Sequence, residues 1–122
     1  MPRVLLVDDD PVILRLLDVN FRLEGFETAT ASRGDQVLDA AREHGPDAIV
    51  LDLMLPGLDG YEVIAALRAD AELSSIPVVL LTARAMDEDR ARAASIDADY
   101  VTKPFDPGDL VALVRSRTEG AP

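Results

Sequence analysis

Three short apolar runs limit what this chain can fold into. Residues 4–7, 48–51 and 78–81 read VLLV, AIVL and VVLL, without a polar side chain. Unbroken runs of this kind, rich in β-branched residues, are typical of strands buried on both faces of a parallel sheet. Residues 26–30 and 98–102 mix polar with apolar residues, which favours strands at the sheet edges. The sequence therefore predicts five strands, of which three are interior.

Segments with helical spacing separate these strands, and several have recognisable ends. Asp10 is placed to cap the first helix, with Pro11 in its first turn and Gly25 beyond its end. Ser32 is expected to cap the second helix. Residues 59–62 (DGYE) have the form of a capping box for the third. The predicted helices cover residues 11–24, about 33–44, about 60–69, about 87–95 and about 107–117.

Strands and helices alternate along the chain with short connections. This alternation implies right-handed crossovers and a three-layer sandwich, with helices on both faces of the sheet. Because the first, third and fourth strands are the most apolar, they fit the interior of a flavodoxin-like α/β fold, a (βα)5 arrangement with strand order 2-1-3-4-5. At 122 residues the chain fits one domain. We expect that domain to span residues 1–118, with residues 119–122 as a flexible tail or the start of a linker.

Polar side chains follow the predicted strands at their carboxyl ends, where the functional crevice of such a fold lies. Asp8 and Asp9 follow the first strand, and Asp52 follows the third. Thr82 and Lys103 follow the fourth and the fifth. Clustered carboxylates repel one another, and a divalent cation relieves the repulsion. Oxygen ligands suit Mg²⁺ or Mn²⁺ rather than zinc, and the chain has no cysteine for a thiolate site.

A metal ion, a carboxylate, a hydroxyl and an ammonium group together favour phosphoryl transfer, with a carboxylate as nucleophile. In this setting the chain resembles, over almost its whole length, the receiver domain of response regulators from bacterial two-component signal transduction systems. The matching elements are Asp8-Asp9, Asp52 with Pro56 and Gly60 after it, Leu81-Thr82-Ala83, and Tyr100 followed by Lys103-Pro104-Phe105.

The resemblance implies a phosphorylation-dependent signalling switch. Asp52 would accept a phosphoryl group from a sensor histidine kinase or a phosphotransfer protein. Asp9 and Asp52 would bind Mg²⁺ through their side chains, Met54 would bind it through its backbone carbonyl, and Asp8 would act through water. The resemblance implies a regulatory domain and not an enzyme, because such a domain assists only its own phosphorylation and dephosphorylation.

The resemblance also implies how the phosphoryl group is held and read. Lys103 and Thr82 would contact phosphate oxygens, and the backbone N–H of Ala83 would complete the cradle. Tyr100 would turn inward on phosphorylation, and the Lys103–Pro104 bond would be cis. The helix at 87–95 has few large apolar residues, and weak anchorage suits an element that moves. We expect the face formed by this helix, the strand at 98–102 and the last helix to carry the output, or to form a homodimer.

Charge narrows the choice of partners. The chain has 23 Asp and Glu against 12 Lys and Arg, a formal net charge of −11, which disfavours direct binding to nucleic acid or to an anionic membrane. Its apolar runs are far shorter than the ~20 residues that span a bilayer, and the acids at 8–10 interrupt any signal-peptide core. We expect a cytoplasmic protein that acts on a downstream protein or a fused output domain.

Three other functions are weighed against this one. A receiver-like module that binds partners without taking phosphate would have lost Asp52, Lys103 or the acidic pair, and none is lost. A Mg²⁺-dependent phosphatase of the haloacid dehalogenase type needs a second Asp two residues after the nucleophile, where Met54 stands. A flavin carrier needs a Ser/Thr/Gly-rich phosphate loop after the first strand, and the acids at 8–10 would repel a phosphate there.

Four basic residues outside these motifs have plainer interpretations. His44, the only histidine, is expected to be solvated near the end of the second helix. Arg84, Arg90 and Arg92 are expected to form a solvated helix surface that is available to an acidic partner.

Overall fold

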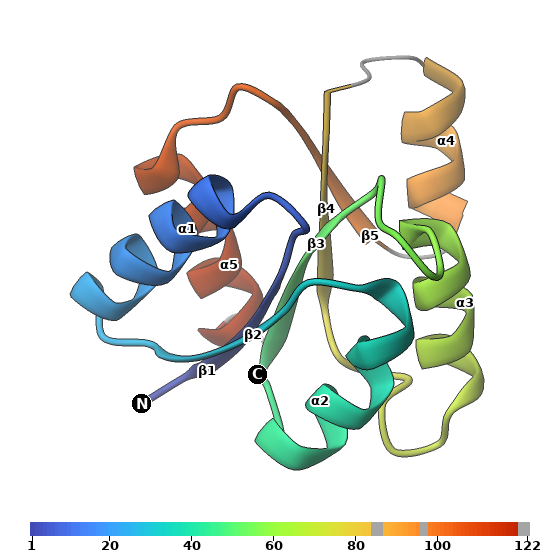
Figure 1. Ribbon diagram of the computed structural model, residues 1–122, viewed down its shortest axis with the longest axis horizontal. Helices are drawn as coiled ribbons and strands as arrows, with labels where there is room; N and C mark the ends of the chain where they lie inside the picture. The colour runs from blue at the N-terminus through green and yellow to red at the C-terminus, as the bar shows by residue number, and fades with distance from the viewer. Residues whose placement is uncertain (84–86, 96–97, 120–122) are drawn as a thin grey trace.

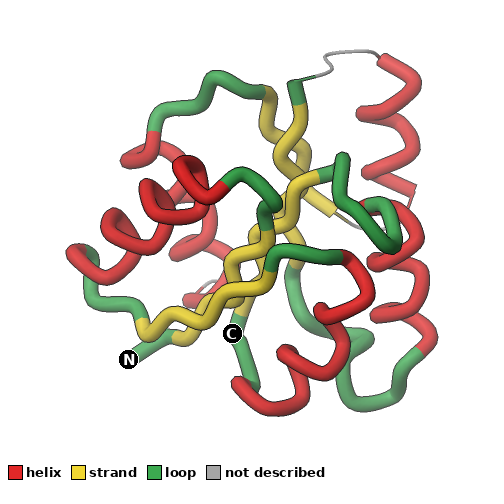
Figure 2. The backbone as a smooth tube through the Cα atoms, in the orientation of Figure 1, coloured by secondary structure: helices red, strands yellow, loops and turns green. Residues whose placement is uncertain are grey.

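A computed structural model describes residues 1–83, 87–95 and 98–119 of the chain. Five parallel strands form one sheet in the order β2-β1-β3-β4-β5. The strands lie in the middle of the molecule, with helices on either side (Figure 2). The predicted α/β fold and strand order are therefore confirmed. The strands are β1 (Arg3–Val7), β2 (Glu27–Ala31), β3 (Ala48–Asp52), β4 (Val78–Thr82) and β5 (Ala98–Thr102).

Helices cover both faces of the sheet. One face carries α1 and α5, and the other carries α2, α3 and α4 (Figure 1). The helices are α1 (Pro11–Leu23), α2 (Val37–His44), α3 (Gly60–Ala69), α4 (Asp87–Ser95) and α5 (Pro107–Glu119), and a 3₁₀ turn, η1 (Gly34–Gln36), precedes α2. No helix within the described residues is long and apolar enough to cross a membrane.

The sheet separates two hydrophobic clusters. Leu5, Ile49 and Leu80 point to the cluster beneath α2 and α3, whereas Leu6 and Val50 point to the cluster beneath α1 and α5. Residues 4–7, 48–51 and 78–81 are all buried, as expected for interior strands. Every residue of the edge strand β5 is partly exposed, which agrees with its mixed sequence.

Two helix ends are as the sequence predicts. The side chain of Asp10 accepts a hydrogen bond from the Val12 N–H at 2.9 Å, ahead of Pro11. Asp59 and Glu62 form a reciprocal capping box at the start of α3. Both caps satisfy N–H groups that the first helical turn would leave without partners.

The prediction that Ser32 caps the second helix is wrong. The chain enters η1 first, and the Ser32 N–H donates to Oε1 of Gln36 instead. The reason is a contact with a distant loop: the Gly34 N–H donates to the Pro56 carbonyl at 3.0 Å. A Cβ at position 34 would lie 2.0 Å from the Leu58 carbonyl oxygen, so only glycine fits there.

The predicted boundary at residue 118 cuts through the end of α5. Glu119 is the last residue of this helix, whereas the sequence prediction places it in the tail. Residues 120–122 of that predicted tail lie outside the described residues. Arg84 also lies outside the described residues.

Candidate functional site

The polar residues that follow the strands meet at one edge of the sheet. Asp8 comes directly after β1, Asp52 is the last residue of β3, and Thr82 is the last residue of β4. Their exposed fractions are 1%, 5% and 1%, and they are the buried polar residues among those described. Parallel strands order their carboxyl ends side by side, which is why residues so far apart in the sequence converge here.

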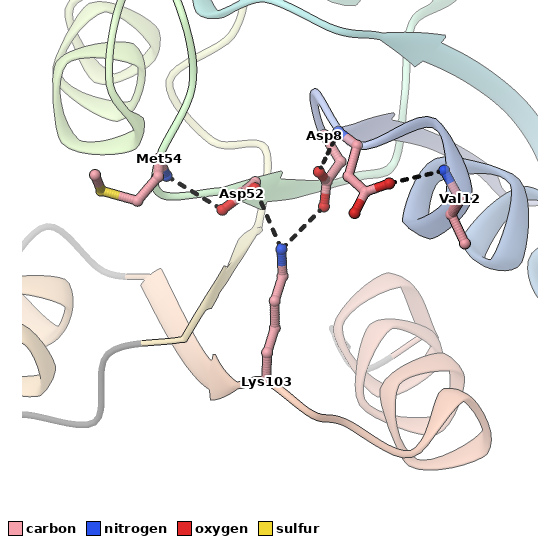
Figure 3. Close-up of polar contacts among 6 residues, drawn as sticks. Asp8, Val12, Asp52, Met54 and Lys103 are labelled. Carbon is pink, nitrogen blue, oxygen red and sulfur yellow. Dashed lines mark hydrogen bonds and ion pairs between the residues drawn. The ribbon is translucent and has the colours of Figure 1, made fainter.

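Lys103 reaches this cluster from the edge strand β5. Its Nζ lies 3.2 Å from Oδ2 of Asp8 and 3.2 Å from Oδ2 of Asp52 (Figure 3). The Lys103 N–H donates to the Thr82 carbonyl at 2.7 Å, and the peptide bond to Pro104 is cis. One ammonium group therefore bridges the two buried carboxylates.

Backbone N–H groups orient both of these carboxylates. Oδ1 of Asp8 accepts from the Asp10 N–H at 2.9 Å, and Oδ1 of Asp52 accepts from the Met54 N–H at 3.1 Å (Figure 3). Each acid thus uses one oxygen for its own loop and the other for Lys103. Both groups are held in place before any ligand arrives, as a preorganised site requires.

Three carboxylates in this cluster lie close enough to share a metal ion. Asp8, Asp9 and Asp52 each offer an oxygen, and these oxygens lie within 4.8 Å of one another. Asp9 is exposed while the other two are buried, so the cluster opens to solvent on one side. Hard oxygen donors with room for water suit Mg²⁺ or Mn²⁺.

Burial and neighbouring charges shift the pKa values of Asp8 and Lys103. Burial raises the pKa of Asp8, and the nearby Asp52 charge adds to this, while the Asp10 N–H and Lys103 lower it in part. For Lys103, burial lowers the pKa, but the carboxylates of Asp52 and Asp8 outweigh burial and raise it. Lys103 is therefore charged at neutral pH, and it only partly neutralises the acids.

The remaining predicted site residues lie on or shortly after strands β3, β4 and β5. The Met54 side chain is 61% exposed, while its backbone lies beside Asp52. Ala83 is exposed and directly follows Thr82. Tyr100 is half-buried on β5, paired in register with Leu80, and packs against the cluster under α2 and α3.

One of the plainer interpretations is wrong, and another is incomplete. His44 is not a freely solvated residue: its Nε2 is buried, and no described residue hydrogen-bonds it. Its backbone carbonyl accepts from Arg3, and the residue borders a shallow surface pocket with Phe26 and Thr28. Arg92 is exposed, as predicted, and its guanidinium carbon also lies 3.9 Å from the centre of the Tyr61 ring. Neither residue had a local sequence signal, since both contacts join separate elements. Arg84 and the side chain of Arg90 lie outside what the structure describes.

A family model described as the response regulator receiver domain matches residues 4–115. The chain belongs to this family. The receiver domain is 48% identical over 116 residues to the DNA-binding response regulator MtrA of Mycolicibacterium smegmatis, covering 94% of this chain and 50% of that protein. It spans about half the length of the curated relatives it matches.

Solved structures give the same assignment. The Francisella response regulator 1452 receiver domain matches this receiver with a TM-score of 0.91 and 30% identity, over 98% of each chain. The receiver domain of sensor histidine kinase PA1611 from Pseudomonas aeruginosa PAO1 matches with a TM-score of 0.86 and 31% identity, over 98% of each chain. In that relative a magnesium ion is coordinated in the active site cleft. The chain is thus a regulatory domain of the phosphorylation-dependent switch type, and the phosphatase and binding-only alternatives are not favoured.

Proposed function

We propose that Asp52 of this receiver domain is the phosphoryl acceptor. One observation carries the proposal: a buried strand-end carboxylate whose Oδ2 is held by Lys103 beside two further acids. An oxygen of Asp52 attacks the phosphorus of a phosphohistidine on a sensor kinase or phosphotransfer protein. The P–N bond breaks, its electron pair stays on the imidazole nitrogen, and an acyl phosphate forms.

The metal of this reaction is Mg²⁺, with Mn²⁺ as a substitute. Asp9 and Asp52 would hold it directly, Met54 through its backbone carbonyl, and Asp8 through water; the cluster of oxygens within 4.8 Å supports this assignment. The ion supplies positive charge that offsets the acids and the incoming phosphoryl group. Asp8 would orient a water on the ion, and its carboxylate is held in place by the Asp10 N–H.

Residues on or directly after β4 and β5 contact the phosphoryl group and change position in response to it. Lys103 contacts one phosphate oxygen instead of the free carboxylate, and the Thr82 hydroxyl and the Ala83 N–H contact others. Tyr100 follows Thr82 inward and changes the face formed by α4, β5 and α5. Added charge and acceptor oxygens supply a bias of about 2–5 kcal/mol, which is enough to repopulate two packings.

The partner that donates the phosphoryl group docks on α1. Four of its large apolar side chains are exposed, and they follow a 4-3-4 spacing along one face: Val12 (74%), Leu16 (40%), Val19 (45%) and Leu23 (78%). This spacing fits the apolar face of a partner helix. The stripe begins beside Asp10, so a helix seated on it lies next to the acidic cluster.

The output is a downstream protein or a domain fused to this receiver. The MtrA relatives are named DNA-binding response regulators, and we propose a DNA-binding output that is not part of residues 1–118. With a net charge of −11, the receiver itself does not bind DNA. It turns over no external substrate.

Intact-mass measurement after incubation with Mg²⁺ and acetyl phosphate tests the chemistry. We expect the wild-type chain to gain one phosphoryl group and Asp52→Asn to gain none. The same incubation with EDTA should leave the wild-type mass unchanged. A wild-type chain that takes no phosphoryl group under any of these conditions would overturn the proposal and revive the binding-only module.

A further inference from the structure

The contact between Arg92 and Tyr61 joins the two helices on one side of the sheet. The Arg92 guanidinium carbon lies 3.9 Å from the centre of the Tyr61 ring, which is within the range of a cation–π contact. Arg92 lies on α4 and Tyr61 on α3, and Figure 1 shows these helices adjacent beyond the same face of the sheet.

Little else of the described part of α4 anchors it. Among the side chains of residues 91–95 only Ala93 is buried, and the others are exposed. An alanine buries far less apolar area than a leucine or an aromatic residue, so it contributes little to helix docking. Within residues 91–95, the stacked guanidinium of Arg92 and the buried Ala93 are therefore the side-chain contacts that hold α4 in place.

Tyr61, by contrast, is buried and held in place by the structure around it. It is 6% exposed and lies in the first turn of α3, within the Asp59–Glu62 capping box. The preceding Gly60 N–H donates to the Leu53 carbonyl at 2.8 Å, and a Cβ on Gly60 would lie 2.9 Å from Leu53 Cα. Leu53 directly follows Asp52, so the hydrogen bond from Gly60 to Leu53 ties the start of α3, and with it the Tyr61 ring, to the loop after the acceptor.

We propose that Arg92 is a positioning residue that holds α4 against α3 in the unphosphorylated domain and sets how readily α4 shifts. The link to signalling rests on the proposed function of Asp52. A contact made in one of two states biases their equilibrium by its own free energy. Arg92 thus opposes the shift that phosphorylation favours, on a route through Leu53 and Tyr61 that is separate from Thr82 and Tyr100.

Amide hydrogen exchange of residues 87–95, followed without phosphate, tests the contact itself. Arg92→Met keeps the length of the side chain but removes its charge, and Tyr61→Leu keeps the burial but removes the ring. We expect either change to speed exchange in α4 by roughly 2- to 5-fold, the range of a cation–π contact at an exposed site. The double variant should exchange no faster than either single one. Tyr61→Phe, which keeps a ring, should stay close to the wild type.

Arg115→Met is the matched control. Arg115 lies over the Phe26 ring at 5.4 Å on the opposite face of the sheet, so its loss should leave exchange in α4 unchanged. Unchanged exchange in Arg92→Met, or additive effects of Arg92→Met and Tyr61→Leu, would overturn the proposal.

A second arm tests the link to signalling. Acetyl phosphate should change α4 exchange less in Arg92→Met than in the wild type, because the variant lacks the contact from the start. An equal change in both would show that the contact does not oppose the shift. If the wild-type chain takes no phosphoryl group, the proposed function fails, whereas exchange in the unphosphorylated variants still decides whether Arg92 holds α4.

Discussion

Asp8 shows how the acidic site opposes folding. Burial and the charge of Asp52 raise its pKa, so the folded chain holds a proton at Asp8 more tightly than the unfolded chain does. As the pH rises through that titration, ionisation of Asp8 costs folding free energy. Lys103 and the Asp10 N–H recover part of this cost. The site is therefore kept for its chemistry, not for stability.

Replacement of Asp8 by asparagine should stabilise the metal-free domain. At pH 7.5 we expect Asp8→Asn to raise the melting temperature by about 2–5 °C, since it removes a repelling charge and keeps an acceptor for the Asp10 N–H. The advantage should shrink as the pH falls, because wild-type Asp8 then becomes protonated. Thermal melts across pH measure this.

A control for this change is Asp39→Asn, on the exposed surface of α2. It should alter stability by less than about 0.5 kcal/mol. A lower melting temperature for Asp8→Asn at pH 7.5 would contradict the prediction, because the ion pair with Lys103 would then outweigh the repulsion.

Asp9 should matter for the metal and little for the fold. It is the exposed member of the oxygen cluster, and a ligand that binds only the folded state raises the melting temperature as its concentration rises. We expect Asp9→Asn to need about ten times more Mg²⁺, or more, for the same rise in melting temperature as the wild type. Thermal melts over a Mg²⁺ titration measure the difference.

Asp10→Ser is the matched control for Asp9→Asn. It removes the neighbouring charge but keeps a side chain that caps α1, so its Mg²⁺ dependence should stay close to that of the wild type. An equal loss in both variants would mean that Mg²⁺ responds to the general negative charge of the loop and not to a specific ligand.

Helix α1 presents two faces with different tasks. Leu17 and Phe21 are buried beneath it, while Val12, Leu16, Val19 and Leu23 lie on the exposed face. The buried face packs α1 against the sheet, whereas the exposed apolar side chains are not packed against any other described residue of the core. We expect Leu16→Glu to slow phosphoryl transfer from the partner kinase at least tenfold, because the carboxylate would be desolvated against an apolar helix.

Transfer from a small donor separates docking from chemistry. Leu16→Glu should take phosphate from acetyl phosphate at the wild-type rate, since the acidic cluster is untouched. Equal rates of kinase transfer for Leu16→Glu and the wild type would exclude the α1 stripe as the docking face, while an equal loss with both donors would point to damage within the site.

The sequence predicts those helix ends and strands that are determined by residues close to one another in the chain. The Asp10 cap and the Asp59–Glu62 box use neighbours in sequence, and the buried strands depend on uninterrupted apolar runs. The start of α2 differs from its prediction because a hydrogen bond from Gly34 to the Pro56 carbonyl decides it, and no nearby residue encodes that bond.

The same distinction holds for the candidate site. Strand order alone brings Asp8, Asp52 and Lys103 to one edge, so the pattern of strand-end residues is enough to predict their proximity. The position of Arg92 over Tyr61 and the burial of His44 Nε2 depend on how helices rotate and pack against other elements. Such contacts cannot be predicted from sequence periodicity, because periodicity indicates which face of a helix is buried but not which residue of another element packs against it.

The two clusters on either side of the sheet have a consequence for how such a domain diversifies. The proposed docking stripe on α1 lies over the cluster that contains Leu17 and Phe21, whereas α4 contributes Ala93 to the other cluster. The interior strands lie between them and are buried throughout. Under the proposed docking on α1, substitutions that change the choice of kinase should therefore leave the packing under α4 unchanged. The choice of kinase and the ease of switching would then vary independently within one small fold.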